Sequence, residues 1–334
     1  MSTTTIIGEP VRNHAGPPTR DVDAVLESGY SSMRAPIGES VLVAGPLLRS
    51  VNQAVPEGLS TIGVADSTSL VVRYTQPNVD STVGPLGAEG VGSSITVTGT
   101  VARVPFADSA DAVLVLVETP GGPVVFVAPD DVRSLDTGTD LAGNPLSTLM
   151  FDGVEIESPA PVSRQMVADV RVRLALVHAV LIAGAAQRCA EMTVAHTSTR
   201  KQFGRTLDHF QAVKQNVALL LQEVALVRGV VRLALRHLDA AGSEPLSAAG
   251  RTAATAAVVQ ASVSAGEIAR LSHQLHGAVG FTELSDLHLY TTRLWASRDA
   301  IGGGWNSGLG ASALAAGADG VWNLVTACTE GLNR

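Results

Sequence analysis

After residue 161 the hydrophobic positions follow the period of long α-helices. From Phe210 to Leu238 apolar side chains recur every three or four residues, for about eight helical turns. A succession of such helices joined by short loops predicts an antiparallel bundle. The further segments predicted as helices are 164–198, 247–276, 286–299 and 309–329.

Between residues 61 and 156 the period shortens to that of β-strands. Short β-branched runs are separated by turn-forming pairs such as Gly121-Gly122 and Asp130-Asp131. This alternation of strands and turns predicts a compact antiparallel barrel or sandwich. The predicted strands are Leu70–Tyr74, Ile95–Val104, Ala112–Glu118, Pro123–Ala128 and Leu149–Ile156.

The N-terminal part of the chain is predicted to hold two short helices between residues 21 and 55, which Pro56 and Gly58 bring to an end. Residues 1–20 are expected to be a loose leader. The chain therefore predicts an α+β fold. Its expected domains are an N-terminal helical segment (1–58), a β-domain (59–160) and a C-terminal helical bundle (161–334).

Composition and charge exclude several classes of function. The chain has 334 residues, of which 46% are hydrophobic, and a net charge of −8. Its Lys and Arg residues form no basic cluster, so nucleic acid is excluded as a partner. The two cysteines, Cys189 and Cys328, exclude a disulfide framework and a zinc site built from thiolates. Without a signal pattern or an apolar stretch of membrane-spanning length, we expect a cytoplasmic protein with no membrane insertion.

The first motif with chemical potential is the run from Arg200 to Arg205, Arg-Lys-Gln-Phe-Gly-Arg, which lies between two predicted helices. The Arg200 guanidinium can pair with a phosphate, and the Gln202 amide can hydrogen-bond a polar ligand. Gly204 lets a ligand approach the backbone closely. An ordinary turn between helices with surface arginines would have the same spacing, so both interpretations remain open.

The second motif is Gln-Leu-His-Gly-Ala-Val-Gly-Phe-Thr at residues 274–282. Gly277 and Gly280 follow a helix and predict a turn whose backbone amides face outward, as in an anion-binding site. His273 and His276 lie on one helical face, but no nearby set of carboxylates completes a ligand shell. We therefore expect no metal site here.

Together the two motifs resemble those of the acyl-CoA dehydrogenase family, which has Arg-x-Gln-Phe-Gly and, farther along, Gln-x-x-Gly-x-x-Gly. The segment from Asp286 to Arg293 is similar to the sequence after the glycine turn in many actinobacterial members, and Phe151–Ile156 is similar to the closing strand of the family's β-domain. The order of helices, strands and helical bundle agrees with the family as well.

The resemblance implies that FAD lies between two subunits, with the bundle of one subunit reaching the pyrophosphate and adenosine of the flavin held by its neighbour. A guanidinium, an amide and open backbone suit a diphosphate chemically. Carried over by position, the implied FAD contacts are Arg200, Gln202, Phe203, Leu207, Phe210, Gln274, Gly277 and Gly280.

The sequence departs from the family at three places. The N-terminal helical segment, residues 1–58, is truncated. The β-domain segments that lie against the flavin ring in the family are replaced by residues 64–69 and 101–106. The family also uses a Glu as general base, but both positions known for it, within Arg171–Leu176 and Asp299–Trp305, lack one here. We therefore assign no catalytic residue to this chain.

With these three departures, the chain resembles the shorter, non-catalytic subunit of actinobacterial heteromeric α2β2 acyl-CoA dehydrogenases. The resemblance implies a paralogous partner that supplies the catalytic Glu, and an acyl-CoA substrate such as the CoA thioester of a steroid side chain. Electron-transfer flavoprotein is the implied acceptor. Two alternatives remain open: a flavin-free structural or regulatory protein of the same fold, and a self-sufficient enzyme that uses Asp299 or Glu283 as its base.

Overall fold

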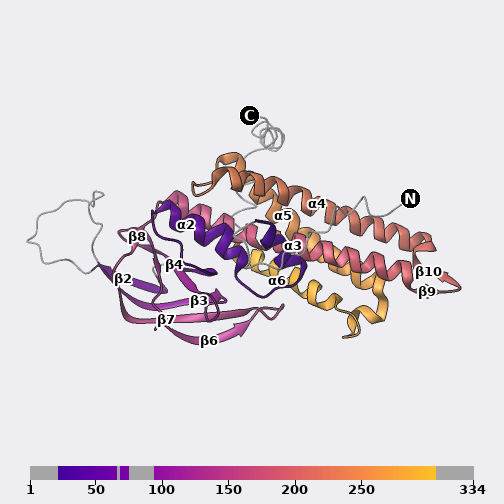
Figure 1. Cartoon of the computed structure of the whole chain (residues 1–334), viewed down its shortest axis with the longest axis horizontal. Helices are drawn as coiled ribbons and strands as arrows, with labels where there is room; N and C mark the ends of the chain where they lie inside the picture. The colour runs from indigo at the N-terminus through magenta and orange to yellow at the C-terminus, as the bar shows by residue number, and fades with distance from the viewer. Residues whose placement is uncertain (1–21, 66–67, 75–93, 306–334) are drawn as a thin grey trace, which may run out of the picture.

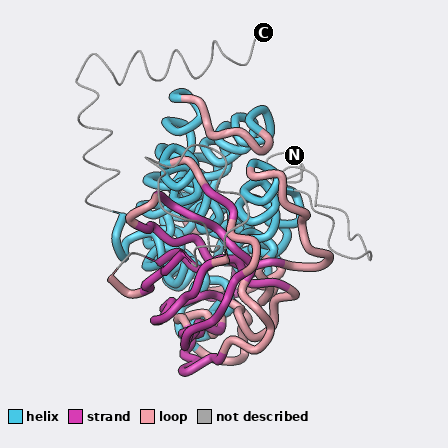
Figure 2. Tube along the Cα trace, turned by 90° about the vertical axis from the view of Figure 1, so that its left-hand side faces the viewer, coloured by secondary structure: helices cyan, strands magenta, loops and turns pink. Residues whose placement is uncertain are grey.

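The computed structural model describes residues 22–65, 68–74 and 94–305 (Figure 1). The helix predicted at 309–329 and the leader expected at 1–20 lie outside these residues. Long helices occupy one part of the molecule, and two sheets lie across one end of them. Figure 2 views the chain from that end, with the strands in front of the helices.

The bundle consists of helices whose starts and ends agree closely with the sequence pattern. Two of them begin at a serine cap: the Ser163 side chain accepts the Met166 N–H at 3.1 Å, and the Ser247 side chain accepts the Gly250 N–H at 3.1 Å. The helices are α3 (Arg164–Thr199), α4 (Gln211–Ala241), α5 (Ala248–His276) and α6 (Leu287–Trp305).

Helix α3 lies at the centre of the fold and packs against α1, α4, α5 and α6. Its buried residues cover every face, among them Leu176, Val180 and Ile182. A helix that is apolar all round is a core helix, whereas α4 buries only one stripe. The position of α3 therefore sets where the other helices can lie.

Within the described residues, eight strands form two four-stranded sheets, with orders β1-β4-β5-β8 and β2-β3-β7-β6. A hydrophobic core lies between the sheets, where Phe126 and Phe151 meet edge to face at 6.0 Å. The strands are β1 (Ser60–Ala65), β2 (Leu70–Tyr74), β3 (Ile95–Pro105), β4 (Ala112–Thr119), β5 (Gly122–Val127), β6 (Arg133–Thr139), β7 (Pro145–Ile156) and β8 (Ala160–Pro161).

The β-domain differs from the sequence expectation in two respects. Strand β1 pairs with β4 in parallel, from Ser60 opposite Ala112 onward, so the sandwich is not wholly antiparallel. Strands β1, β6 and β8 were not among the predicted strands: β6 is mostly polar and lacks a β-branched run, and β8 has only two residues. The other pairs are antiparallel.

The N-terminal segment contains α1 (Val22–Tyr30), the π-helix η2 (Glu39–Ala44) and α2 (Gly45–Ser50). Helix α1 crosses α3 with almost no space between the backbones. A Cβ atom on Gly29 would lie 2.5 Å from the Leu181 carbonyl oxygen, and one on Gly184 would lie 2.7 Å from the Tyr30 nitrogen. The crossing therefore requires glycine on both helices.

No helix within the described ranges combines the length and apolar character needed to cross a bilayer.

We expect Gly184→Ala to lower the free energy of unfolding by about 1–3 kcal/mol, because the new methyl group must push α1 away from α3. Gly229→Ala is the matched control: it lies in α4, and a Cβ there would contact no other atom within 4 Å. That change should stabilise the chain by up to about 1 kcal/mol through helix propensity. Urea unfolding followed by circular dichroism measures both, and equal stability of the two variants would contradict the close crossing.

Candidate functional site

The two sequence motifs meet at the end of the bundle that lies away from the sheets. The His196 ring, one turn before Arg200, stacks on the His276 ring, directly before Gly277, at a centroid distance of 4.5 Å. This contact places the C-terminal ends of α3 and α5 side by side. In Figure 1 the β9–β10 hairpin that follows α3 projects from this end.

The first motif folds as a small hairpin of β9 (Lys201–Gln202) and β10 (Arg205–Thr206). Phe203 and Gly204 at its tip have φ angles of 52° and 79°, as the tight turn of a two-residue hairpin requires. The Leu207 N–H closes the hairpin by donating to the Arg200 carbonyl at 2.9 Å. Arg200 and Gln202 are both exposed, so their guanidinium and amide groups face outward.

Two side chains of this hairpin contact the Phe210 ring. The Arg205 guanidinium lies 4.2 Å above its centroid, and the Phe203 ring meets it edge to face at 6.2 Å. Leu207, half-buried, begins the 3₁₀ turn η3 (Leu207–His209) that connects the hairpin to α4. The predicted residues of the first motif thus form one connected unit.

The second motif forms the 3₁₀ turn η4 (Gly277–Phe281). Gly277 has a φ of 63°, a conformation that other residues adopt at a cost. Gly280 is buried, and a Cβ there would lie 2.7 Å from the Cβ of His276. Gln274 is exposed, and its Oε1 accepts a hydrogen bond from Arg270 at 2.8 Å, so the amide NH₂ remains to donate outward.

The glycine turn rests on a stack of neutral aromatic rings. His273 lies 4.5 Å from the Phe281 ring and 2.9 Å, through Nε2, from the Thr291 hydroxyl. Burial lowers the pKa of both His273 and His276 below the ordinary histidine value, so these rings are uncharged at neutral pH. In the described part of the chain no group of His, Cys, Asp and Glu is arranged to hold a metal ion.

A second feature is a cavity of about 740 Å³ between the N-terminal segment, the sheets, α3 and α6. Leu174 and Ala175 line it from α3, and Asp299 and Ala300 line it from α6. These stretches are the ones in which the sequence lacks the family's Glu. Asp299 lies at the exposed rim and accepts two hydrogen bonds from Arg298, at 3.0 and 2.8 Å. Glu283 lies elsewhere, exposed after the glycine turn.

Glu39, His178 and Arg293 form a polar end of this cavity, and none of them was a candidate from the sequence. Glu39 is only 6% exposed, and burial raises its pKa from 4.5 to about 7. Burial lowers the pKa of His178 to about 4. In the sequence, Glu39 is a single acidic residue at the start of an apolar N-terminal helix. The residues that surround it come from three segments distant in sequence, so the sequence alone did not indicate a polar site there.

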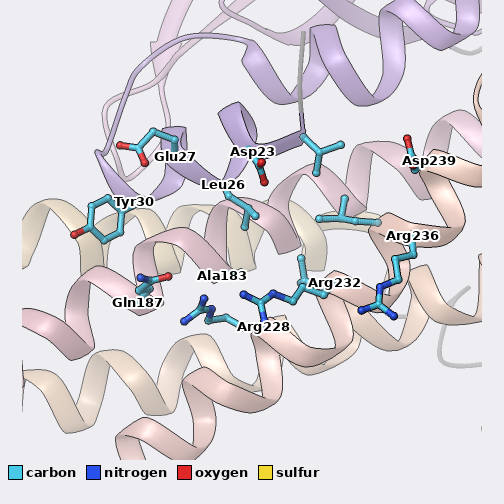
Figure 3. A pocket seen from close by; sticks show the side chains of 13 residues that line it. Asp23, Leu26, Glu27, Tyr30, Ala183, Gln187, Arg228, Arg232, Arg236 and Asp239 are labelled. Atoms are coloured by element: carbon cyan, nitrogen blue, oxygen red, sulfur yellow. The ribbon is translucent and has the colours of Figure 1, made fainter. Parts of the chain in front are cut away.

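A separate cleft of about 450 Å³ lies between α1, α3 and α4. Arg228, Arg232 and Arg236 recur every fourth residue on one face of α4. Figure 3 shows their guanidinium groups on one side of the cleft, with Asp23 and Glu27 of α1 on the other. Because both signs of charge face the cleft, it does not select a ligand by charge alone.

Comparisons with known proteins agree with this architecture. Residues 171–307 match the family described as acyl-CoA dehydrogenase, C-terminal domain. Acyl-CoA dehydrogenase IpdE2 of Mycobacterium tuberculosis is 38% identical over 118 residues, which are 35% of this chain and 34% of that protein. The match thus spans about a third of the length of that relative. Acyl-CoA dehydrogenase FadE27 of the same organism is 28% identical over 84% of this chain and 76% of its own length.

Two solved structures have a similar fold. The ChsE4–ChsE5 complex from Mycobacterium tuberculosis matches with a TM-score of 0.66 and 21% identity, over 84% of this chain and 76% of the matched chain. The Tcur3481–Tcur3483 steroid ACAD matches with a TM-score of 0.64 and 20% identity, over 99% of this chain and 87% of the matched chain. At these identities the likeness concerns the fold.

The raised pKa of Glu39 predicts a distinct pH dependence of stability. Below pH 4.5 the carboxyl is protonated in both folded and unfolded chains, and it contributes nothing to the difference. As the pH rises from 4.5 to 7, the Glu39 carboxyl ionises in the unfolded chain but stays largely protonated in the folded chain. The free energy of unfolding therefore falls by about 3 kcal/mol over this range. Glu39→Gln removes this loss.

We therefore expect Glu39→Gln to be more stable than the unmodified chain at pH 8, by about 3 kcal/mol, with the gap closing toward pH 4.5. Urea unfolding across this pH range measures the gap. Glu283→Gln, which changes an exposed carboxylate, is the control and should follow the unmodified chain. A gap for Glu39→Gln that is constant with pH would show that its carboxyl is not held in a buried environment.

Proposed function

We propose that the chain, whose residues 171–307 match the family described as acyl-CoA dehydrogenase, C-terminal domain, is the non-catalytic subunit of a heteromeric, flavin-dependent member of that family. In this proposal its bundle holds the phosphate and adenosine side of FAD at a subunit interface. A paralogous partner holds the flavin ring and supplies the catalytic Glu.

The observation that carries the proposal is the meeting of the two motifs at one exposed end of the bundle. The His196–His276 stack brings the hairpin of Arg200 and Gln202 beside the turn of Gly277. A guanidinium, a side-chain amide and an open backbone turn are the groups that bind a diphosphate. These residues therefore fit the group that the family implies.

Exposed apolar side chains at the same two motifs favour burial against another subunit. Phe203 at the hairpin tip is 91% exposed, Phe281 in the glycine turn 73%, and Leu284 just after it 87%. Large apolar side chains left in water at neighbouring positions are typical of an interaction surface. A cofactor shared between subunits would lie at such a surface.

In the proposal, this chain and its partner contribute different chemical groups to the reaction. When bound, FAD supplies the hydride acceptor for α,β-desaturation of a CoA thioester. The reaction also needs a base within hydrogen-bond reach of the α proton. Leu174 and Ala175 are apolar at one family position for that base. In the proposal this chain therefore binds and orients the cofactor, and the partner's Glu takes the proton.

The substrate proposed is an acyl-CoA, specifically the CoA thioester of a steroid side chain, and the electron acceptor proposed is electron-transfer flavoprotein. Of the two similar solved structures, one is the ChsE4–ChsE5 complex and the other, Tcur3481–Tcur3483, is described as a steroid ACAD. Fold likeness to these proteins supports the heteromeric proposal and the substrate class. A flavin-free structural role is the second candidate, but it gives no reason for diphosphate-binding groups to gather at an exposed end.

We expect Arg200→Ala to weaken FAD binding by the assembled complex roughly ten- to hundredfold, because a guanidinium paired with a diphosphate contributes about 1.5–3 kcal/mol. Flavin titration of the complex with its partner chain measures the affinity. Arg164→Ala is the matched control, since Arg164 is exposed at the opposite end of the same helix. Unchanged affinity in the Arg200 variant, with the complex intact, would remove Arg200 from the flavin surface.

We also expect Asp299→Asn and Glu283→Gln to leave the rate of flavin reduction by an acyl-CoA nearly unchanged. Loss of a general base costs about 10²–10⁴-fold in rate, whereas loss of an exposed carboxylate costs almost nothing. Stopped-flow bleaching of the flavin in the complex measures this rate. A loss of that size at Asp299, with FAD still bound, would favour the self-sufficient enzyme instead.

A further inference from the structure

One exposed stripe on the last two turns of α5 leads to the glycine turn. Arg270, Gln274 and Gly277 are exposed and lie four and three residues apart, so they share one face of this end of the helix. The residues between them are buried, namely Leu271, Ser272, His273, Leu275 and His276. Side chains on the stripe therefore meet each other or a group from outside, whereas the core takes the others.

The Arg270 guanidinium is held from both sides along this stripe. Its Nε and Nη2 donate to the two carboxylate oxygens of Glu267, one turn earlier, at 2.8 and 2.5 Å. Its Nη1 donates to Oε1 of Gln274, one turn later, at 2.8 Å. Two parallel bonds to one carboxylate fix the plane of a guanidinium. The third bond is therefore aimed along the stripe at Gln274.

This third bond decides which end of the Gln274 amide faces outward. A guanidinium can only donate, so the atom that Arg270 contacts must be the amide oxygen. The NH₂ group, at the other end of the planar amide, is left to donate to an external group. The oxygens of a diphosphate accept hydrogen bonds, and they would be repelled by an amide oxygen. Gln274 thus presents the end that suits a diphosphate before the ligand arrives.

The charge of Arg270 is already balanced within the stripe. Glu267 and Arg270 form an ion pair, and the hydrogen bonds from Arg270 lower the pKa of the Glu267 carboxyl below its usual value. Both groups are therefore charged at neutral pH, with opposite signs. Each guanidinium nitrogen also has an acceptor within α5. Arg270 is thus arranged to orient Gln274 rather than to contact an anion itself.

We infer that Arg270, anchored by Glu267, is a positioning residue that fixes the Gln274 amide with its NH₂ group toward the diphosphate side of the cofactor. The inference rests on the proposed function, in which Gln274 contacts FAD. An exposed glutamine without such a contact rotates among many conformers, and ordering it on binding weakens affinity roughly two- to tenfold. The pair of Glu267 and Arg270 removes this cost before FAD binds.

A double-mutant cycle on the assembled complex tests this role. Glu267→Ala and Arg270→Ala are made together, so that the net charge is unchanged, and flavin titration measures the FAD affinity with and without Gln274→Ala. We expect the paired change to weaken FAD binding roughly two- to tenfold when Gln274 is present, and to have no further effect in the Gln274→Ala background. Arg164→Ala is again the control, and gel filtration with circular dichroism checks assembly and folding.

Two results would overturn the inference. One is an unchanged affinity in the paired variant. The other is the same loss with and without Gln274, which would mean that the pair acts on the helix or on FAD directly. The Arg200→Ala and Gln274→Ala variants separate these results from failure of the proposed function. If both weaken FAD binding and the paired change shows no coupling to Gln274, only the role of Arg270 is wrong. If neither weakens it, FAD does not bind at these motifs, and the inference falls with the proposed function.

Discussion

A buried ion pair on α3 holds the segments of this chain in their places. Arg173 and Asp169, four residues apart and both almost inaccessible, pair with each other inside the fold. The Arg173 guanidinium also donates to the carbonyls of Leu42 and Gly242, and the Asp169 carboxylate accepts the Leu246 N–H at 2.9 Å. Removing one partner of such a pair costs about 3–5 kcal/mol. The N-terminal segment, α3 and the loop between α4 and α5 are fixed to one another at this point.

Both candidate sites depend on where that central helix places its neighbours. At one end, α3 and α5 finish side by side, and the exposed hairpin and glycine turn offer donors to an external diphosphate. At the other, α3 and α6 face the sheets and the π-helix η2, and they enclose a cavity whose polar end is buried. The first site is open and suited to sharing with a second chain. The second is a cavity lined by residues of this chain alone, with side chains of both charges around it.

The periodic parts of the fold could be predicted from the sequence because each long helix and buried strand repeats one pattern over many residues. Strand β6 could not, since its polar residues give no such signal, and neither could the parallel pairing of β1 with β4. The residues proposed to contact the flavin were named from two local motifs, but their meeting depends on the His196–His276 contact between helices distant in sequence. Glu39 could not be assigned to a cavity, because its neighbours come from segments that only the folded chain brings together.

The central claim is that this chain holds one side of a flavin and needs another chain for the rest. The most direct measurement is the amount of FAD per chain, from the visible absorbance of purified protein. We expect little or no flavin when the chain is expressed alone. We expect a yellow complex when the chain is expressed with a longer family member that keeps the catalytic Glu. One FAD per chain in the protein purified alone would contradict it.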